Sequence, residues 1–244
     1  MLTYACAPSS PFREAQNLSA KPFDQLELAG NACGPAALLN SYRFGKTDWR
    51  KLSEEPPGLS DRERMRTIAR GPAMRESASL PGRARWSKNG INISDLGDVA
   101  NEISAGKMLP RLSNETLVIS PIESPEKHLR RVHYKLANSL SQGVPPILSI
   151  RLFAKREGKW IPIQGHFVTV TSVPSSLAGG ATSFPVKFID PLGGKFREGR
   201  IVIGSDTEMN FFTEAEFPGV TIGRNYVRAG EEAYLSVAAV LGRF

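Results

Sequence analysis

The sequence contains few of the residues that build disulfide frameworks and metal sites. Among its 244 residues there are only two cysteines, Cys6 and Cys33, and three histidines. Two cysteines are too few for a disulfide framework or for a cysteine-rich zinc site. A single disulfide between Cys6 and Cys33 is the less favoured alternative to two free thiols.

Long apolar segments are also absent. No run of about 18 apolar residues occurs, which excludes a membrane-spanning helix. The N-terminal stretch MLTYACAPSSPFREAQNLSA has neither a basic n-region nor a long apolar h-region, so it does not resemble a signal peptide. We therefore expect a cytoplasmic protein as the sequence is written, or a secreted or periplasmic one if a signal peptide has been removed.

Acidic residues are outnumbered by basic ones. Lysine and arginine number 31 against 24 aspartates and glutamates, giving a net charge of +7 and a pI of about 9.6. This charge favours anionic partners or surfaces, although by itself it says more about solubility and non-specific attraction than about function. With 41% hydrophobic residues, the composition is that of an ordinary globular protein, long enough for one ample domain or two small ones.

The first part of the chain has helical patterns. Residues 1–24 are rich in Ser, Pro, Ala and Asn, and we expect an irregular arm there. Four helices are expected after it: from Cys33 to a stop at Gly45, over 60–71, over 93–104 with Ser94 as N-cap, and over 124–143 with Ser124 as N-cap and Pro125 at the first position.

The second part of the chain has strand patterns. Five segments rich in β-branched or aromatic residues and bounded by Gly and Pro predict strands: 146–153, 165–173, 186–190, 200–204 and 233–241. Helices followed by a run of strands indicate an α+β fold with a mainly antiparallel sheet. We expect one domain over 25–244, with a helical part over about 25–143 and a sheet part over about 144–244.

Cys33 lies in the stretch GNACGPAALLN, between small residues and at the expected start of a helix. Pro35 suits the first turn of a helix, where its missing N–H is not needed. A helix N-terminus presents unpaired N–H groups and a positive dipole end, which favour the thiolate form of a cysteine placed there. Cys33 is therefore a candidate nucleophile, against the ordinary interpretation of a lone cysteine as a core residue.

Two later residues could serve as a base and its orienting group. His166 opens the strand GHFVTVTSV, whereas His128 and His133 lie among Lys and Arg on the 124–143 helix and indicate a solvated basic face. Asp190 ends the strand in FIDPLGG. A carboxylate there could hold an imidazole in its productive tautomer, or could form a simple Asx-turn before the proline. Cysteine, histidine and aspartate in this order suit a thiol protease.

Three short blocks, NACGPAAL, GHFVTV and IDPLGG, together resemble the papain-like cysteine peptidases, and more narrowly their C39-like branch. The histidine of papain-like enzymes follows the cysteine by about 130–150 residues, as it does here. The resemblance runs from about Gln25 to Phe196, and the insertion between Ser60 and Lys88 has no counterpart in it.

The resemblance implies a role for each of the three residues. Cys33 would be the nucleophile, His166 the general base and acid, and Asp190 the orienting residue. It also implies a papain-like fold, in which a helical subdomain headed by the cysteine-bearing helix packs against an antiparallel sheet. The substrate would lie in the cleft between these two parts.

One position departs from the family's pattern. These enzymes usually place a glutamine some six residues before the cysteine, where its amide completes the oxyanion hole. Glu27 stands there instead, and an ionised carboxylate cannot donate. Gln25 and Asn31 are the available donors, and we favour Gln25. Loss of one oxyanion donor costs on the order of 100- to 1000-fold in rate, so a chain without a replacement would be feeble or non-catalytic.

We expect a hydrolase that cleaves a peptide or amide bond of a peptide or protein through a thioester, with no metal and no organic cofactor. Three alternatives stay open: an acyltransferase of the transglutaminase or phytochelatin-synthase kind, a non-catalytic pseudo-peptidase, and a basic binding module. The last would use the Arg-rich segment 62–88, where Trp86 could stack a base, to hold nucleic acid or another anionic polymer. This segment carries no recognisable nucleic-acid-binding motif.

Overall fold

A computed structural model of the chain describes residues 10–55, 57–204, 206, 208–209 and 211–244. In this part of the chain, strands close into a six-stranded antiparallel barrel: β5 (Ile147–Arg156), β6 (Lys159–Pro174), β7 (Ser183–Asp190), β8 (Lys195–Ile203), β9 (Thr213–Glu216) and β10 (Ala233–Gly242). The strand order is β6-β5-β10-β9-β8-β7, and β7 pairs with β6 to close the ring. Two shorter strands extend the sheet, β1 (Phe12–Glu14) on β6 and β4 (Ser113–Thr116) on β10.

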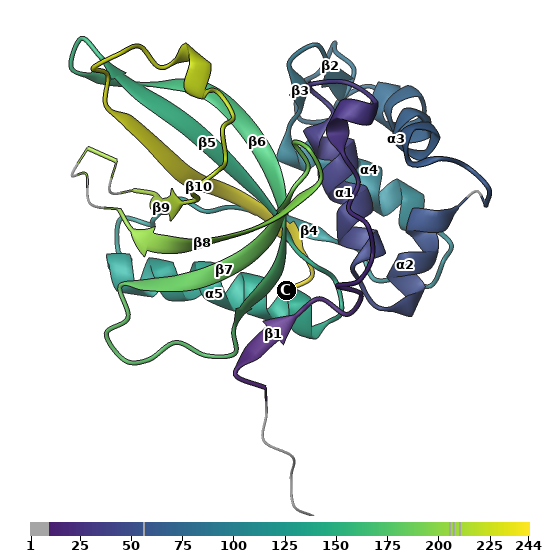
Figure 1. The fold of residues 1–244 in the computed structure, drawn as a ribbon, viewed down its shortest axis with the longest axis horizontal. Coiled ribbons are helices and arrows are strands. Elements are labelled where there is room, and N and C mark those ends of the chain that lie inside the picture. Colours follow the sequence, from purple (N-terminus) through teal and green to yellow (C-terminus); the bar gives the residue numbers. More distant parts are fainter. Residues whose placement is uncertain (1–9, 56, 205, 207, 210) are drawn as a thin grey trace, which may run out of the picture.

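Most helices lie together on one side of the barrel, at the right of Figure 1: α1 (Cys33–Arg43), α2 (Thr47–Glu54), α3 (Asp61–Arg70) and α4 (Ile93–Ser104). A small hairpin of β2 (Trp86–Ser87) and β3 (Gly90–Ile91) lies at the top of this helical layer. The remaining long helix, α5 (Pro125–Ser141), runs beneath the barrel. Three short 3₁₀ helices complete the described elements: η1 (Gln25–Glu27), η2 (Pro72–Met74) and η3 (Arg224–Tyr226).

The expected mixture of helices with a mainly antiparallel sheet is confirmed. Two hydrophobic cores share that sheet. One fills the barrel and the space against α5, and includes Leu129 and Val168. The other joins the sheet to α1–α4, and includes Leu38 and Phe167. Successive side chains of a strand point to opposite faces, so neighbours such as Phe167 and Val168 serve different cores.

Side-chain caps fix the starts of three helices. Ser124 accepts a hydrogen bond from the backbone of Lys127, so α5 begins as predicted, with Pro125 at its first position. The prediction of Ser94 as the N-cap of α4 is wrong. Asn92 caps that helix two residues earlier, because its side chain accepts from the backbone of Asp95. At α3, Ser60 and Glu63 form a reciprocal capping box.

The boundaries of the expected parts differ from the structure in two places. The arm expected to be irregular contains β1, which pairs with the end of β6, while residues 1–9, including Cys6, lie outside the described residues. Helix α5, which we expected in the helical part, packs its apolar face on the barrel instead. Among the described helices, none has the length and apolar character needed to cross a membrane.

Candidate active site

Cys33 is the first residue of α1 and is half-buried, with a free thiol. The residue before it, Ala32, provides no side-chain cap, so the first N–H groups of α1 have no acceptor within the helix or from a capping side chain. A Cβ at Gly34 would lie only 2.3 Å from Cγ2 of Ile91, so the glycine allows the β2–β3 hairpin to pack against the start of α1. The thiol therefore sits at the positive end of a helix, beside a closely packed hairpin.

His166 on β6 and Asp190 at the end of β7 form a buried pair. The Nε2 atom of His166 lies 2.9 Å from Oδ1 of Asp190, and both side chains are about 1% exposed. The Asp190 carboxylate has two further donors: the backbone N–H of Leu192 at 2.9 Å and the Nε of Arg197 at 3.2 Å. These contacts orient both the carboxylate and the imidazole that it holds.

The other ring nitrogen of His166, Nδ1, is buried and forms no hydrogen bond of ordinary geometry with any described residue. Cys33 and His166 nevertheless line the same cleft. Burial alone would lower the pKa of His166, but the interactions of the ring with Asp190 and with Cys33 raise it to about 9. Burial likewise opposes ionisation of Asp190, yet the contacts with His166, Leu192 and Arg197 hold its pKa below the ordinary value.

A cleft of about 790 Å³ opens in front of Cys33 and His166. One wall comes from the helical layer and includes Asn31 and Ile91, and the other comes from the barrel and includes Phe167. The structure thus brings the three sequence-predicted residues together at the seam between the two layers, with Cys33 from the helical side and His166 and Asp190 from the barrel. This seam lies between α1 and β6 in Figure 1.

The two predicted oxyanion donors behave differently. Asn31 donates to the backbone carbonyls of Ser87 at 2.9 Å and Lys88 at 3.3 Å, so its amide holds the β2–β3 hairpin and is not free for an oxyanion. Gln25 is fully buried and donates one N–H to the Gly30 carbonyl at 2.6 Å, while its Oε1 has no partner among the described residues. Gln25 retains a second amide proton.

Glu27, which occupies the position of the family's usual glutamine, pairs with Lys21 at 3.6 Å.

The prediction of a solvated face for His128 and His133 is wrong, because both are buried. His128 lies 3.4 Å from Glu123, and Nε2 of His133 lies 2.7 Å from the Pro174 carbonyl. Burial is the main cause that lowers the pKa of each ring. Neither residue lines the cleft, so His166 is the histidine available there.

The Arg-rich segment does not form one continuous basic surface. Arg85 is buried and pairs with Glu102 at 2.9 Å, and Arg75 pairs with the same carboxylate at 3.1 Å. Trp86 is half-buried in the helical core, where its indole donates to the Asn31 carbonyl. Much of the segment is therefore structural.

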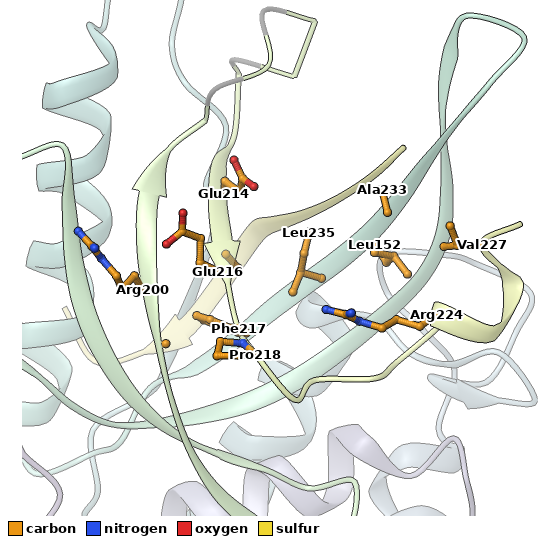
Figure 2. A pocket seen from close by; sticks show the side chains of 12 residues that line it. Leu152, Arg200, Glu214, Glu216, Phe217, Pro218, Arg224, Val227, Ala233 and Leu235 are labelled. Atoms are coloured by element: carbon orange, nitrogen blue, oxygen red, sulfur yellow. The ribbon is translucent and has the colours of Figure 1, made fainter. Parts of the chain in front are cut away.

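A second cavity, of about 750 Å³, lies between the barrel and the chain that follows β9. Figure 2 shows Arg224 reaching across it toward Leu235, with Glu214 and Glu216 on β9 at its other end. No cysteine or histidine stands among its lining residues, all of which lie in the described part of the chain. The groups suited to nucleophilic catalysis belong to the cleft at Cys33.

Comparison with models of protein families, with curated proteins and with solved structures found no match to this chain. Function is therefore argued from the geometry of the cleft.

Proposed function

We propose that this chain is a papain-like cysteine peptidase or amidohydrolase of the C39-like kind, which hydrolyses a peptide or amide bond. The observation that carries the proposal is the placement of a helix-terminal thiol and a buried histidine–carboxylate pair at one cleft. The family resemblance predicts a cysteine-bearing helix packed against an antiparallel sheet that carries the histidine and the aspartate, and β6 and β7, which carry them here, are paired strands.

The charge state of His166 supports this chemistry. With a pKa of about 9, the ring is protonated near neutral pH, and an imidazolium beside Cys33 favours the thiolate. The thiolate is the nucleophilic form of cysteine. Asp190 keeps Nε2 of the ring occupied, which directs Nδ1–H toward the sulfur.

The reaction begins when the Cys33 thiolate attacks the carbonyl carbon and forms a C–S bond. The carbonyl electron pair moves to oxygen, and the resulting oxyanion collapses as the C–N bond breaks. His166 gives its Nδ1 proton to the departing amine, leaving a thioester. Neutral His166 then takes a proton from water, whose oxygen attacks the thioester and releases the Cys33 thiolate and a carboxylic acid.

We assign the oxyanion to two donors. The backbone N–H of Cys33 lies at the uncapped start of α1, and the Gln25 amide is bonded to the carbonyl of Gly30, which lines the cleft. Glu27, paired with Lys21, takes no part. In this proposal Gln25 takes the role that a glutamine nearer to the cysteine has in the family.

Selective alkylation tests the proposal. Iodoacetamide should label Cys33 faster than Cys6 and abolish hydrolysis of a peptide library, as followed by mass spectrometry. His166→Ala should slow the labelling of Cys33, because the imidazolium no longer stabilises the thiolate, whereas His133→Gln should not.

Equal, slow labelling of both cysteines would contradict the proposal. The product masses identify the acceptor: hydrolysis yields free acids, and transfer to an added amine yields amides.

A further inference from the structure

Three cations line the same cleft as the candidate nucleophile. Arg83 and Lys88 come from the helical wall, and Arg151 comes from β5 on the barrel wall. All three are exposed, and none forms an ion pair with a described residue. The cations therefore face the cleft from both of its walls.

Backbone contacts join the segments of two of these cations to the segments that hold the reacting groups. Arg151 pairs with Gly165 across the β5–β6 ladder, and the next pair in register is Ile150 with His166. On the other wall, the carbonyl of Lys88 accepts a hydrogen bond from the Asn31 side chain, two residues before Cys33. Each wall thus carries an exposed cation on a segment bonded to one that holds a reacting group.

No carboxylate balances these charges within the cleft. None of its lining residues, all in the described part of the chain, is aspartate or glutamate. Asp95 lies next to the cleft in sequence but is fully buried, with hydrogen bonds from Ser77 and Asn92 at 2.7 Å each. Asp190 lies behind His166 and is bonded to it and to Arg197. The cleft therefore presents positive charge that its own walls leave uncompensated.

We infer that the cleft binds acidic peptides, with aspartate or glutamate side chains near the bond that is cut; the inference rests on the proposed function for the identity of the substrate as a peptide. Arg151 and Lys88 would pair with carboxylates of the peptide on the two sides of the reacting carbonyl. Arg83 would add a further positive charge along the helical wall. Charge complementarity of this kind raises association rates and selects among partners. Apolar lining residues such as Ile163 and Phe212 contact the rest of the peptide.

Binding to a Cys33→Ala protein tests this inference without requiring turnover. The probe is a fluorescein-labelled, C-terminally amidated decapeptide with glutamate at alternate positions, measured by fluorescence anisotropy against a matched glutamine peptide. We expect the glutamate peptide to bind about tenfold more tightly or better at low salt, and the difference to shrink as salt is added.

Matched charge variants separate the cleft from the general positive charge of the protein. Replacing Arg83, Lys88 and Arg151 with glutamine should abolish the preference for the glutamate peptide. The control variant replaces three exposed cations outside the cleft, Arg62, Lys127 and Lys159, and should keep the preference at the same net charge. The single variant Lys88→Gln, on an exposed turn, supplies a milder change if the triple variant does not fold.

Equal binding of the two peptides, binding of neither, or equal loss in the two triple variants would overturn the inference. A third peptide, the glutamine peptide with a free C-terminus, tests another ligand. Tighter binding of that peptide alone would show that the cations recognise a C-terminal carboxylate instead of acidic side chains. The proposed function fails separately: an unreactive Cys33 with cleft-dependent binding of the glutamate peptide would leave a binding site without catalysis. A reactive Cys33 that cuts neutral peptides equally well would leave a peptidase without this specificity.

Discussion

Two clusters in this protein combine a buried histidine with a carboxylate and an arginine, yet the pKa values of the two histidines shift in opposite directions. At the cleft, His166 lies 2.9 Å from Asp190, and its pKa is raised to about 9. On α5, His128 lies 3.4 Å from Glu123, and its pKa is lowered. A nearby carboxylate does not by itself decide the charge of a buried imidazole.

The position of the arginine differs between the clusters. Arg131 donates to both oxygens of Glu123 at 2.9 Å, and its guanidinium lies 3.0 Å from Nδ1 of His128. Burial, followed by the positive charge of Arg131, lowers the pKa of His128 against the opposite effect of Glu123. Arg197 instead donates to the Asp190 oxygen that His166 does not use. The two arginines therefore act differently: Arg131 lies beside the His128 ring and lowers its pKa, whereas Arg197 contacts the carboxylate that holds His166.

The largest expected effect comes from replacing each carboxylate with alanine. Asp190→Ala should lower kcat/KM by about 10³- to 10⁴-fold, a loss like that caused by removing the aspartate of a Ser-His-Asp triad. Glu123→Ala should leave kcat/KM per folded molecule unchanged, because His128 lies outside the cleft. The kcat/KM of each variant is measured by peptide hydrolysis and normalised to the amount of Cys33 that can be labelled. Similar losses in the two variants would contradict a catalytic role confined to the Asp190 cluster.

The next effect is a dependence on pH. Because the proposed active form pairs protonated His166 with a thiolate, kcat/KM should fall about tenfold per pH unit once the pH exceeds about 9. The raised pKa of His166 also contributes to the free energy of unfolding. This contribution is complete below pH 6.5 and, like the activity, is lost as the pH rises through about 9. NMR of the ring nitrogens at about pH 8 should find His166 protonated and His128 neutral. A neutral His166 at that pH would contradict the proposed ion pair.

The sequence located the cleft groups because each has a local signature. Cys33 begins a helix before Gly-Pro, and His166 and Asp190 each lie at an end of an apolar run, on strands that pair in the barrel. Their catalytic roles stay predictions. Arg197 has no such signature: it stands in KFREGR, an ordinary polar strand, and only the β7–β8 register, which pairs it with Phe188, brings it to Asp190.

The misjudged histidines have a similar explanation. On α5, Lys and Arg neighbours suggested a solvated face for His128 and His133, but the apolar stripe of this helix packs on the barrel and draws both rings inward. Asn31 was misjudged because the hairpin carbonyls that it bonds, at Ser87 and Lys88, are far away in the sequence. Contacts between distant segments decided these cases, and composition and spacing do not encode them.

A smaller effect should follow from Arg197→Gln, which removes the positive charge beside Asp190. The pKa of Asp190 should rise, because Arg197 is one of the groups that lower it, and the acid limb of the pH–rate profile should move upward. We expect kcat/KM to fall roughly three- to tenfold near neutral pH, since His166 and Leu192 still hold the carboxylate. Lys159→Gln removes the same charge from an exposed position on β6 and should leave the profile in place. An unmoved acid limb in Arg197→Gln would show that this arginine only packs.

We expect no effect on activity from Arg131→Gln, although this variant is the one that most changes the cluster around His128. The pKa of His128 should rise, because a positive neighbour disappears and Glu123 is released to pair with the ring. Loss of the ion pairs to Glu115 and Glu123 should lower the free energy of unfolding by roughly 1–3 kcal/mol, measured by urea denaturation.

Arg130→Gln is the matched control for this variant. Among the described residues, Arg130 bonds to the backbone carbonyls of Leu177 and Ala178, so its loss should leave the pKa of His128 unchanged. If the pKa of His128 stays low in Arg131→Gln, burial alone keeps that ring neutral. The opposite pKa shift of His166 would then be explained by Cys33 and by the close Asp190 contact. The placement of the two arginines would not explain the difference between the two pKa values.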